Sequence, residues 1–302
     1  MKDSILIAGG TGFIGKNFIL FLKRKKTFKI YSLSSQTPSK KDIIKGVHYI
    51  CCKLENKKLL KKNINFDLDY VVNFAGYIDH SNSKETFNSH YIGLKNLAEI
   101  FNKKKIKKFI QIGSSVEYGF LRSPQKEIHQ INYKKLKSVY GKSKLMASNF
   151  LIRLYKKNKF PVLILRPYLL YGPGQNFNRL IPFIIKNCLK NKSFNCSNGK
   201  QIRNFTFIDD FLKIVYKCLF LKCYGEIINV GSIKNYTIKF IINKIKKIIG
   251  KGNPIFGKIK LRKDEPIKLY PNILKLKNLV GYNQETEILL GLKKTINFYK
   301  KK

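Results

Sequence analysis

The sequence predicts an α/β protein built on a doubly wound parallel sheet, with a smaller second domain. Short apolar runs alternate with longer amphipathic segments in the first half, as in parallel strands covered by helices on both faces. Right-handed crossovers between such strands favour the doubly wound order. A glycine-rich turn, GGTGFIG, directly follows the first apolar run and precedes a helical pattern. This is the usual start of a Rossmann-type sheet.

Each element follows from its own pattern of apolar residues, with short runs predicting strands and helical spacing predicting helices. In the segment 205–220, Asp209 or Asp210 is expected near the N-cap of a helix. Strands are expected at residues 4–10, 28–34, 46–52, 69–76, 107–115, 160–168 and 225–231, and helices at residues 14–26, 84–104, 136–157, 179–191 and 205–220.

The regular alternation of strand and helix patterns ends at Tyr171, in the segment YGPGQN. We therefore expect residues 1–171, with 205–232 returning to them, to form a dinucleotide-binding domain. Residues 172–204 and 233–302 are expected to form a smaller α/β domain that binds substrate.

The charge balance is strongly basic, with 61 Lys and Arg against 17 Asp and Glu and a formal net charge of +44. The excess is nearly all lysine and is spread along the chain, whereas arginine is the better reader of bases and phosphates. A solvated lysine coat explains the charge, and no nucleic-acid partner is expected. A polyanion partner and attraction to a membrane surface are the alternatives.

Neither a metal site nor a disulfide framework is expected from the six cysteines, because no C-x-x-C pair occurs. No apolar run reaches the ~18–20 residues needed to cross a bilayer. The first apolar segment is followed by KRKK, the reverse of the charge order in a signal peptide. The sequence therefore predicts a cytoplasmic protein with reduced thiols.

The glycine-rich turn has the composition of a phosphate-binding loop. Gly9, Gly12 and Gly15 allow a tight turn and a close approach of a pyrophosphate, and the following helix offers free N–H groups. An ordinary β–α turn is the alternative interpretation.

The end of the second expected strand bears on the choice of dinucleotide. Ser34 stands where an acidic residue usually binds the adenosine ribose of NAD, and Lys40 and Lys41 lie nearby. A carboxylate there would repel the 2′-phosphate of NADP, so its absence favours NADP, with NAD as the alternative. The alternative interpretation is that Ser34 only caps a loop.

Six motifs in order resemble those of the extended short-chain dehydrogenases/reductases, the NAD-dependent epimerase/dehydratase family, over nearly the whole chain. They are GGTGFIG, VVNFAG, IGSSVEYG, YGKSK, RPYLLYGPGQ and QIRNFTFIDD. The resemblance implies an enzyme that modifies nucleotide sugars. It also implies cofactor contacts from the following residues: Gly9, Gly12, Phe13, Ile14, Gly15, Ser34, Ala75, Tyr140 and Lys144.

Tyr140 and Lys144 are four residues apart and lie on one face of the expected helix. Free tyrosine has a pKa of about 10, too high for a base at neutral pH. A nearby ammonium and an oxidised nicotinamide, both positive, stabilise the phenolate and lower that pKa. The pair is therefore expected to be catalytic, with Lys144 also holding the cofactor ribose.

The family resemblance places the catalytic hydroxyl four residues before Tyr118, at Ser114, with Ser115 as the alternative. Family members that dehydrate sugars carry acidic residues just after this hydroxyl, where this chain has Ser115 and Val116. Glu117 lies one place later, and one residue's shift along an extended segment reverses the direction of the side chain. A 4,6-dehydratase is therefore disfavoured.

Reduction of a 4-keto-6-deoxy sugar and 4-epimerisation both need only hydride transfer and the Ser/Tyr/Lys set. The segment 177–210 is most similar to the CDP-abequose synthase branch, which favours the reductase; nucleotide-sugar 4-epimerase is the alternative. Two rivals are more remote: a non-catalytic RNA-binding member of the fold, which would not need the three residues together, and a flavin- or quinone-type reductase.

Substrate contacts are expected from Ser115 and from two arginines of the second domain. Arg203 and Arg262 match family positions that contact the substrate diphosphate, and planar guanidinium suits that group. Arg179 is a weaker candidate. The family commonly dimerises through two helices per subunit, here residues 84–104 and 136–157, so a homodimer is expected.

The chain departs from the family pattern at three places. Lys53 stands where an acid is common near the adenine, and His90 and Leu169 each replace an asparagine. The first two concern cofactor contacts, and the third concerns a sugar or nucleotide contact. We interpret His90 as a packing or cofactor-edge residue.

Overall fold

The computed structural model describes residues 2–79, 81–261, 265–283 and 286–301. The chain forms two compact units. The first comprises Met1–Gly119, Gln130–Arg166 and Ile214–Ile228. The second comprises Phe120–His129, Pro167–Lys213 and Asn229–Lys302.

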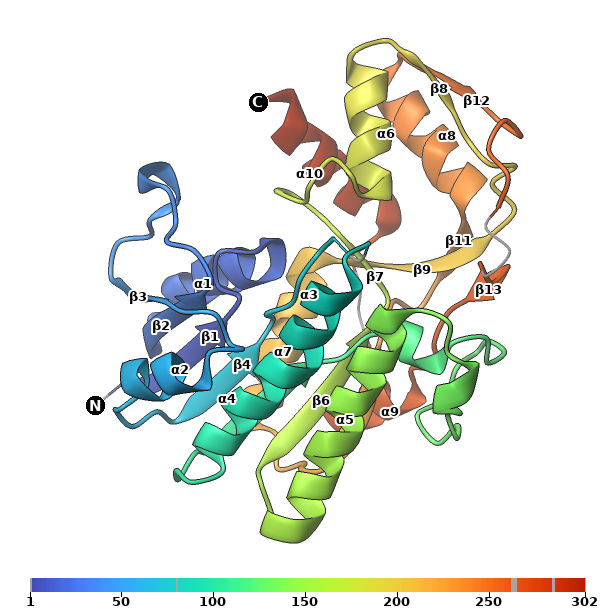
Figure 1. The fold of residues 1–302 in the computed structure, drawn as a ribbon. Coiled ribbons are helices and arrows are strands. Elements are labelled where there is room, and N and C mark those ends of the chain that lie inside the picture. The colour runs from blue at the N-terminus through green and yellow to red at the C-terminus, as the bar shows by residue number, and fades with distance from the viewer. Residues whose placement is uncertain (1, 80, 262–264, 284–285, 302) are drawn as a thin grey trace. The chain divides into compact units, whose positions relative to one another are not determined.

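The first unit is built on a seven-stranded sheet with the strand order β10-β6-β5-β4-β1-β2-β3 (Figure 1). From β1 the chain moves outward to β3 and then returns to β4 on the other side of β1, which confirms the doubly wound order. Ile5 of β1 aligns in parallel with Ile30 of β2 and Tyr70 of β4. Ligands of such sheets bind beyond the carboxyl ends of the strands at this reversal. The strands are β1 (Asp3–Ala8), β2 (Phe28–Ser34), β3 (Val47–Cys51), β4 (Tyr70–Asn73), β5 (Lys108–Ile112), β6 (Val162–Pro167) and β10 (Glu226–Val230).

Helices cover both faces of this sheet (Figure 1). One core cluster joins strand residues to Leu60 of α2, Leu97 of α4 and Leu151 of α5, so these helices share a face. On the other face, the ring of Phe21 in α1 packs edge-on against Tyr216 in α7, with centroids 5.5 Å apart. The helices are α1 (Phe13–Lys25), α2 (Lys57–Asn63), α3 (Ser83–Phe87), α4 (Gly93–Phe101), α5 (Val139–Asn158) and α7 (Ile208–Phe220).

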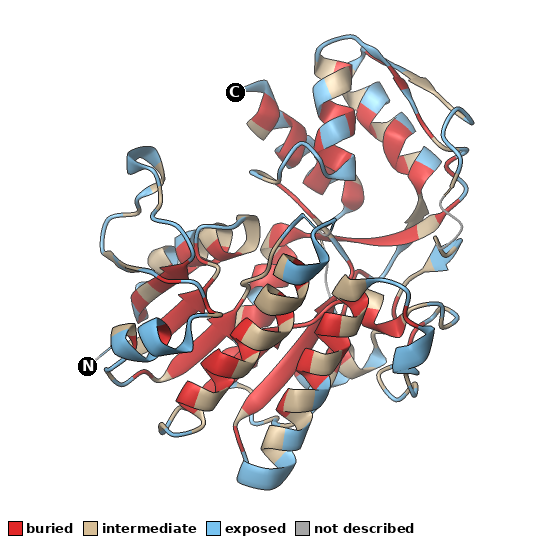
Figure 2. Cartoon of the chain, in the orientation of Figure 1, coloured by how far each residue is buried: buried red, intermediate tan, exposed pale blue. Residues whose placement is uncertain are grey.

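The strands of this sheet other than the edge strand β3 are buried along most of their length (Figure 2). Ile5, Leu6 and Ile7 are all completely inaccessible, although successive side chains point to opposite faces. A strand that is covered on both faces must be apolar throughout, which explains why these runs do not alternate with polar residues.

The second unit contains two smaller sheets. β9 pairs with β11 and β13, and β7 adds to it in parallel, while β12 pairs with β8. The strands are β7 (Leu169–Tyr171), β8 (Ser193–Asn195), β9 (Ile202–Phe207), β11 (Asn235–Thr237), β12 (Asn253–Ile255) and β13 (Lys268–Leu269), and the helices are α6 (Leu180–Leu189), α8 (Ile238–Ile249), α9 (Leu274–Val280) and α10 (Ile288–Lys300).

Two expected helices differ from the observed ones. The predicted helix 84–104 is interrupted by a turn of π-helix, Asn88–Ile92, between α3 and α4. The segment 205–220 is not helical from its start, because residues through Phe207 belong to β9 and α7 begins at Ile208. Asp209 and Asp210 therefore lie in the first turn of α7, where acidic side chains interact favourably with the positive end of the helix dipole.

No helix among the described residues is long and apolar enough to cross a membrane. All six cysteines lie in the described ranges and carry free thiols. Burial raises the pKa of Cys218 to about 12 and that of Cys188 to about 11, so these two thiols are unreactive.

Candidate active site

The glycine-rich turn joins β1 to α1 and lies against the segment that follows β4. Gly9 has a φ of +77°, and a Cβ at this position would lie 2.7 Å from the amide nitrogen of Ala75. A Cβ on Gly15 would lie 2.2 Å from the carbonyl oxygen of Gly9. Only glycine fits at either place. The turn therefore brings together two predicted cofactor residues, Gly9 and Ala75.

The first turn of α1 begins at this glycine-rich turn. Gly12 is the N-cap and makes no side-chain capping bond. The amide groups of Phe13, Ile14 and Gly15 follow at the positive end of a 13-residue helix. A glycine-rich backbone cradle at a helix N-terminus fits the pyrophosphate of a dinucleotide.

Ser34, at the end of β2, stabilises the glycine-rich turn. Its buried Oγ accepts a hydrogen bond of 3.2 Å from the backbone N–H of Thr11. Nearby, Lys16 of α1 forms an ion pair of 2.5 Å with Asp42. The hydrogen bond from Lys16 lowers the pKa of Asp42 to about 2. This acid, which directly follows the exposed Lys40 and Lys41, was not among the residues expected near the cofactor.

Lys144 is buried on α5, one turn after Tyr140. Its Nζ donates a hydrogen bond of 2.8 Å to the carbonyl oxygen of Ile112 at the end of β5. Burial lowers the pKa of Lys144 to about 8, and the negative charge of Glu117 opposes part of that fall. Ser138 starts the helix by accepting a hydrogen bond from the N–H of Gly141.

Tyr140 is half-buried beside the π-helical turn. The ring of His90 packs edge-on against it, with centroids 4.9 Å apart. His90 Nε2 lies 3.0 Å from the carbonyl oxygen of Tyr77. His90 therefore packs directly against the tyrosine, and turns of π-helix often occur at functional sites.

Ser114 follows β5 and caps a short 3-10 turn, Ser115–Tyr118. Its Oγ accepts a hydrogen bond of 3.4 Å from the N–H of Val116. A Cβ on Gly141 would lie 3.1 Å from the carbonyl oxygen of Val116, so the start of α5 packs closely on this turn. The turn that carries Ser114 and the helix end that carries Tyr140 are therefore neighbours. Ser115 is buried in the same turn.

Glu117, in the same short turn, is bonded to buried partners. It is fully buried and forms an ion pair of 2.7 Å with the guanidinium of Arg166. Ser148 of α5 donates a hydrogen bond of 2.7 Å to the same carboxylate oxygen. This carboxylate is bonded to the buried side chains of Arg166 and Ser148.

A buried amide pair lies beneath the site and was not expected from the sequence. Asn73 donates a hydrogen bond of 2.8 Å to Gln111 and accepts one of 3.0 Å from the N–H of Ala75. Gln111 in turn donates to the carbonyl of Ile112, the acceptor used by Lys144. These contacts link Ala75, in the segment after β4, to the carbonyl of Ile112 that accepts from Lys144.

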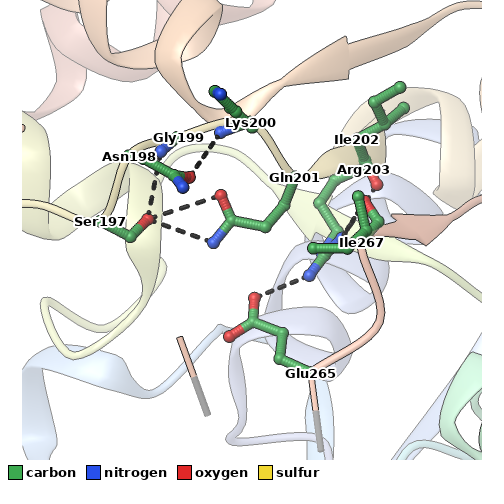
Figure 3. A network of polar contacts seen from close by, with 9 residues as sticks. All are labelled: Ser197, Asn198, Gly199, Lys200, Gln201, Ile202, Arg203, Glu265 and Ile267. Atoms are coloured by element: carbon green, nitrogen blue, oxygen red, sulfur yellow. Dashed lines mark hydrogen bonds and ion pairs between the residues drawn. The ribbon is translucent and has the colours of Figure 1, made fainter. Parts of the chain in front are cut away.

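In the second unit, Arg203 lies on β9 and is almost completely buried. Figure 3 shows its polar contacts. Its guanidinium forms an ion pair of 2.7 Å with Glu265 and donates to the carbonyl oxygens of Ile202 and Ile267. Arg179 is exposed at the start of α6. Arg262 lies outside the described residues. Among the described residues, no cluster of His, Cys, Asp or Glu could hold a metal ion.

The glycine cradle on a doubly wound sheet, with a tyrosine and a buried lysine one turn apart on α5, defines a dinucleotide-dependent enzyme. Residues 5–231 match the model of the NAD dependent epimerase/dehydratase family. The chain belongs to this family, and the resemblance seen in the sequence is confirmed.

A curated relative from Methanocaldococcus jannaschii, named "Putative UDP-glucose 4-epimerase", is 30% identical over 98% of this chain and 98% of its own length. The dTDP-glucose 4,6-dehydratase of Bacillus anthracis, solved in complex with NAD, is 25% identical and superposes with a TM-score of 0.88, covering 99% of this chain and 97% of its own. The UDP-glucuronic acid 4-epimerase of Bacillus cereus, solved with UDP-glucuronic acid and NAD, is 25% identical with a TM-score of 0.87 and covers 99% of both chains.

Proposed function

We propose that the protein is an NAD(P)-dependent oxidoreductase that acts on C4 of a nucleoside-diphosphate sugar. The observation that carries this proposal is the anchoring of Lys144 on the carbonyl of Ile112, at 2.8 Å, one helical turn from Tyr140 and beside the turn of Ser114. A bound nicotinamide dinucleotide would supply hydride transfer at C4.

The three side chains have distinct roles in this proposal. Tyr140 takes a proton from the C4 hydroxyl or returns one to the ketone. Lys144, whose pKa is lowered by burial to about 8, is still mostly an ammonium at pH 7 and stabilises the phenolate of Tyr140. Ser114 donates a hydrogen bond to the sugar oxygen. Its own oxygen already accepts from Val116, so its proton is available.

For the cofactor, we propose that the dinucleotide lies on the cradle of Gly9, Gly12 and the first turn of α1, with Ala75 beside it. NADP is our preferred choice. Ser34 contributes a hydroxyl rather than a carboxylate at the end of β2, and Lys40 and Lys41 are exposed nearby. NAD is the alternative, and the two solved relatives described above contain NAD.

Two reactions fit the same residues. The relative from Methanocaldococcus jannaschii favours 4-epimerisation, since it matches this chain over 98% of its length. The segment 177–210 favours reduction of a 4-keto-6-deoxy sugar. Dehydration is disfavoured because Ser115 and Val116 replace the required acids and Glu117 is buried against Arg166.

For the substrate, we propose that Arg203 binds the diphosphate by exchanging Glu265 for a phosphate oxygen. Arg262 is proposed as a second contact, and Ser115 as a contact to the sugar. The smaller domain, residues 172–204 and 233–302, would thus hold the nucleotide sugar.

A cytoplasmic homodimer, formed through residues 84–104 and 136–157, completes the proposal. Light scattering at micromolar concentration tests the dimer, and a monomer would contradict it. The RNA-binding alternative predicts a salt-dependent complex with RNA and no dinucleotide binding, whereas our proposal predicts dinucleotide binding.

The proposed function is tested by incubating the protein with a panel of UDP, dTDP and CDP sugars. NADPH or NADH is supplied with the 4-keto-6-deoxy forms, and NADP+ or NAD+ with the sugars that carry a C4 hydroxyl. A reductase consumes the reduced nicotinamide in proportion to substrate. An epimerase produces the 4-epimer without net consumption. Inactivity on every nucleotide sugar, with either cofactor, would contradict the proposal.

A further inference from the structure

We infer that Glu117 is a positioning residue that orients Ser114 for the proposed reaction, an inference that rests on the role proposed for Ser114. Glu117 touches no predicted substrate or cofactor group. It acts through the backbone of the serine.

The carboxylate of Glu117 is fixed by donors on both of its oxygens. Oε2 accepts hydrogen bonds from Arg166 Nε at 2.9 Å and from Ser148 Oγ at 2.7 Å, and it forms the ion pair with the Arg166 guanidinium. Oε1 accepts from the backbone N–H of Ser114 at 2.8 Å. The side chains of Glu117 and Arg166 are 0% and 2% exposed, so water does not compete for these bonds.

Ser114 is held from two sides by this arrangement. Glu117 accepts from its amide, and its hydroxyl oxygen accepts from the N–H of Val116, which together form a capping box around the short turn. Rotation of the Ser114 side chain would break the bond from Val116, and movement of its backbone would break the bond to Glu117. The serine is therefore held in the turn on which the start of α5 packs, at Gly141 and Val116.

The hydrogen bond between the Ser114 amide and Glu117 distinguishes the positioning role from a purely structural one. A buried ion pair adds little stability over a well-packed apolar pair of similar volume, because the desolvation of both charges offsets their attraction. An apolar pair could fill the same space. It could not accept the hydrogen bond of the Ser114 amide.

Glu117→Gln separates the two functions of the carboxylate. Because guanidinium only donates, the amide oxygen of glutamine would face Arg166, and its NH2 group would face the N–H of Ser114. The contact with Arg166 is kept, while the restraint on Ser114 is lost.

The experiment is a double-mutant cycle of Glu117→Gln and Ser114→Ala, measured at pH 6.5, below the pKa of about 8 of Lys144. We expect Glu117→Gln to lower kcat by about tenfold or more in the wild-type background, with KM changed by less than about twofold. In the Ser114→Ala background the same substitution should change kcat by less than about twofold, because the group that it positions is gone.

Thermal unfolding and titration with NADH, followed by its fluorescence, verify that each variant is folded and binds cofactor. Ser143→Ala is the matched control. Ser143 is a buried serine on the same helix whose hydroxyl donates to the carbonyl of Val139, and its loss should leave kcat within about twofold. If Glu117→Gln does not fold, Glu117→Met with Arg166→Met, an apolar pair, enters the same cycle.

An equal loss of kcat from Glu117→Gln in both backgrounds, or no loss in either, would overturn the positioning role of Glu117. It would leave the proposed function of the enzyme unaffected. A Ser114→Ala variant as active as the wild type would overturn the role of Ser114 in the proposed function, and the positioning role would fall with it.

Discussion

The ammonium of Lys144 donates a hydrogen bond of 2.8 Å to the carbonyl oxygen of Ile112. This bond joins α5 to the end of β5, where Ser114 follows two residues later. The acceptor of this buried lysine is thus a neutral carbonyl rather than a carboxylate. The more distant Glu117 balances part of its charge.

Replacing Lys144 by methionine should change how stability depends on pH. Burial lowers the pKa of Lys144 from 10.5 to about 8. Between these values the unfolded chain binds the proton and the folded chain does not, so the wild type gains stability as pH rises from about 8 to 10.5. Methionine does not titrate, so Lys144→Met should lose about 3 kcal/mol of stability relative to the wild type as the pH rises over this range. Urea unfolding at several pH values measures it.

Lys108 provides the matched control for this prediction. It is also buried, with its pKa lowered to about 8, but it donates to the carbonyls of Leu221 and Cys223, just after the end of α7. Lys108→Met should show the same direction of pH dependence and keep turnover. A stability difference for Lys144→Met that is flat from pH 7 to 10.5 would contradict the buried ammonium.

Gly9→Ala should abolish dinucleotide binding and destabilise the protein by about 2 kcal/mol or more. The added Cβ would lie 2.7 Å from the amide nitrogen of Ala75, at a φ of +77°. Gly250→Ala is the control, since Gly250 has a φ of +79° and no described atom within 4 Å of the methyl group that alanine would add. It should cost only about 1 kcal/mol and leave NADH binding unchanged. Equal effects on NADH binding would be evidence against the cradle.

Asn73→Leu should destabilise the protein by about 1–3 kcal/mol, because Gln111 and the N–H of Ala75 each lose a buried partner. Adding Gln111→Met removes one of the unsatisfied groups. The double variant should therefore be less destabilised than the sum of the two single variants. Strictly additive free energies of unfolding would show that the pair is not coupled.

Arg203→Met should raise KM for the nucleotide sugar by about tenfold or more, with kcat changed by less than about threefold, because a charge-assisted contact to the diphosphate is lost. Lys200→Met, on an exposed residue of the same segment, should leave KM within about twofold. Steady-state kinetics on the active nucleotide sugar measures both. An unchanged KM for Arg203→Met would rule out the proposed diphosphate contact.

The fold and the family could be predicted from the sequence because their signals are local. Apolar runs, the glycine-rich turn and the spacing of Tyr140 and Lys144 can each be recognised within a few residues. The change from strand to helix at Ile208 was missed because FTF, at the end of β9, continues into the apolar pattern of α7. Strand identity there depends on pairing with β7, which the local sequence does not encode.

The polar partners of the site could not be predicted, because they depend on residues far apart in the chain. Glu117 meets Arg166 across 49 positions, and Arg203 meets Glu265 across 62. The acceptor of Lys144 is a backbone carbonyl, which carries no residue signature at all. The motif identifies the lysine. Its partner becomes known only from the packing of α5 against the end of β5.

The central claim is that Tyr140 transfers the proton. Turnover of Tyr140→Phe, measured on the nucleotide sugar that the wild type accepts, tests it most directly. We predict that kcat falls by about a thousandfold or more, while binding of the reduced cofactor that the wild type uses, NADPH or NADH, stays within about threefold by fluorescence. A variant that binds this cofactor and keeps a kcat within about tenfold of the wild type would contradict the account.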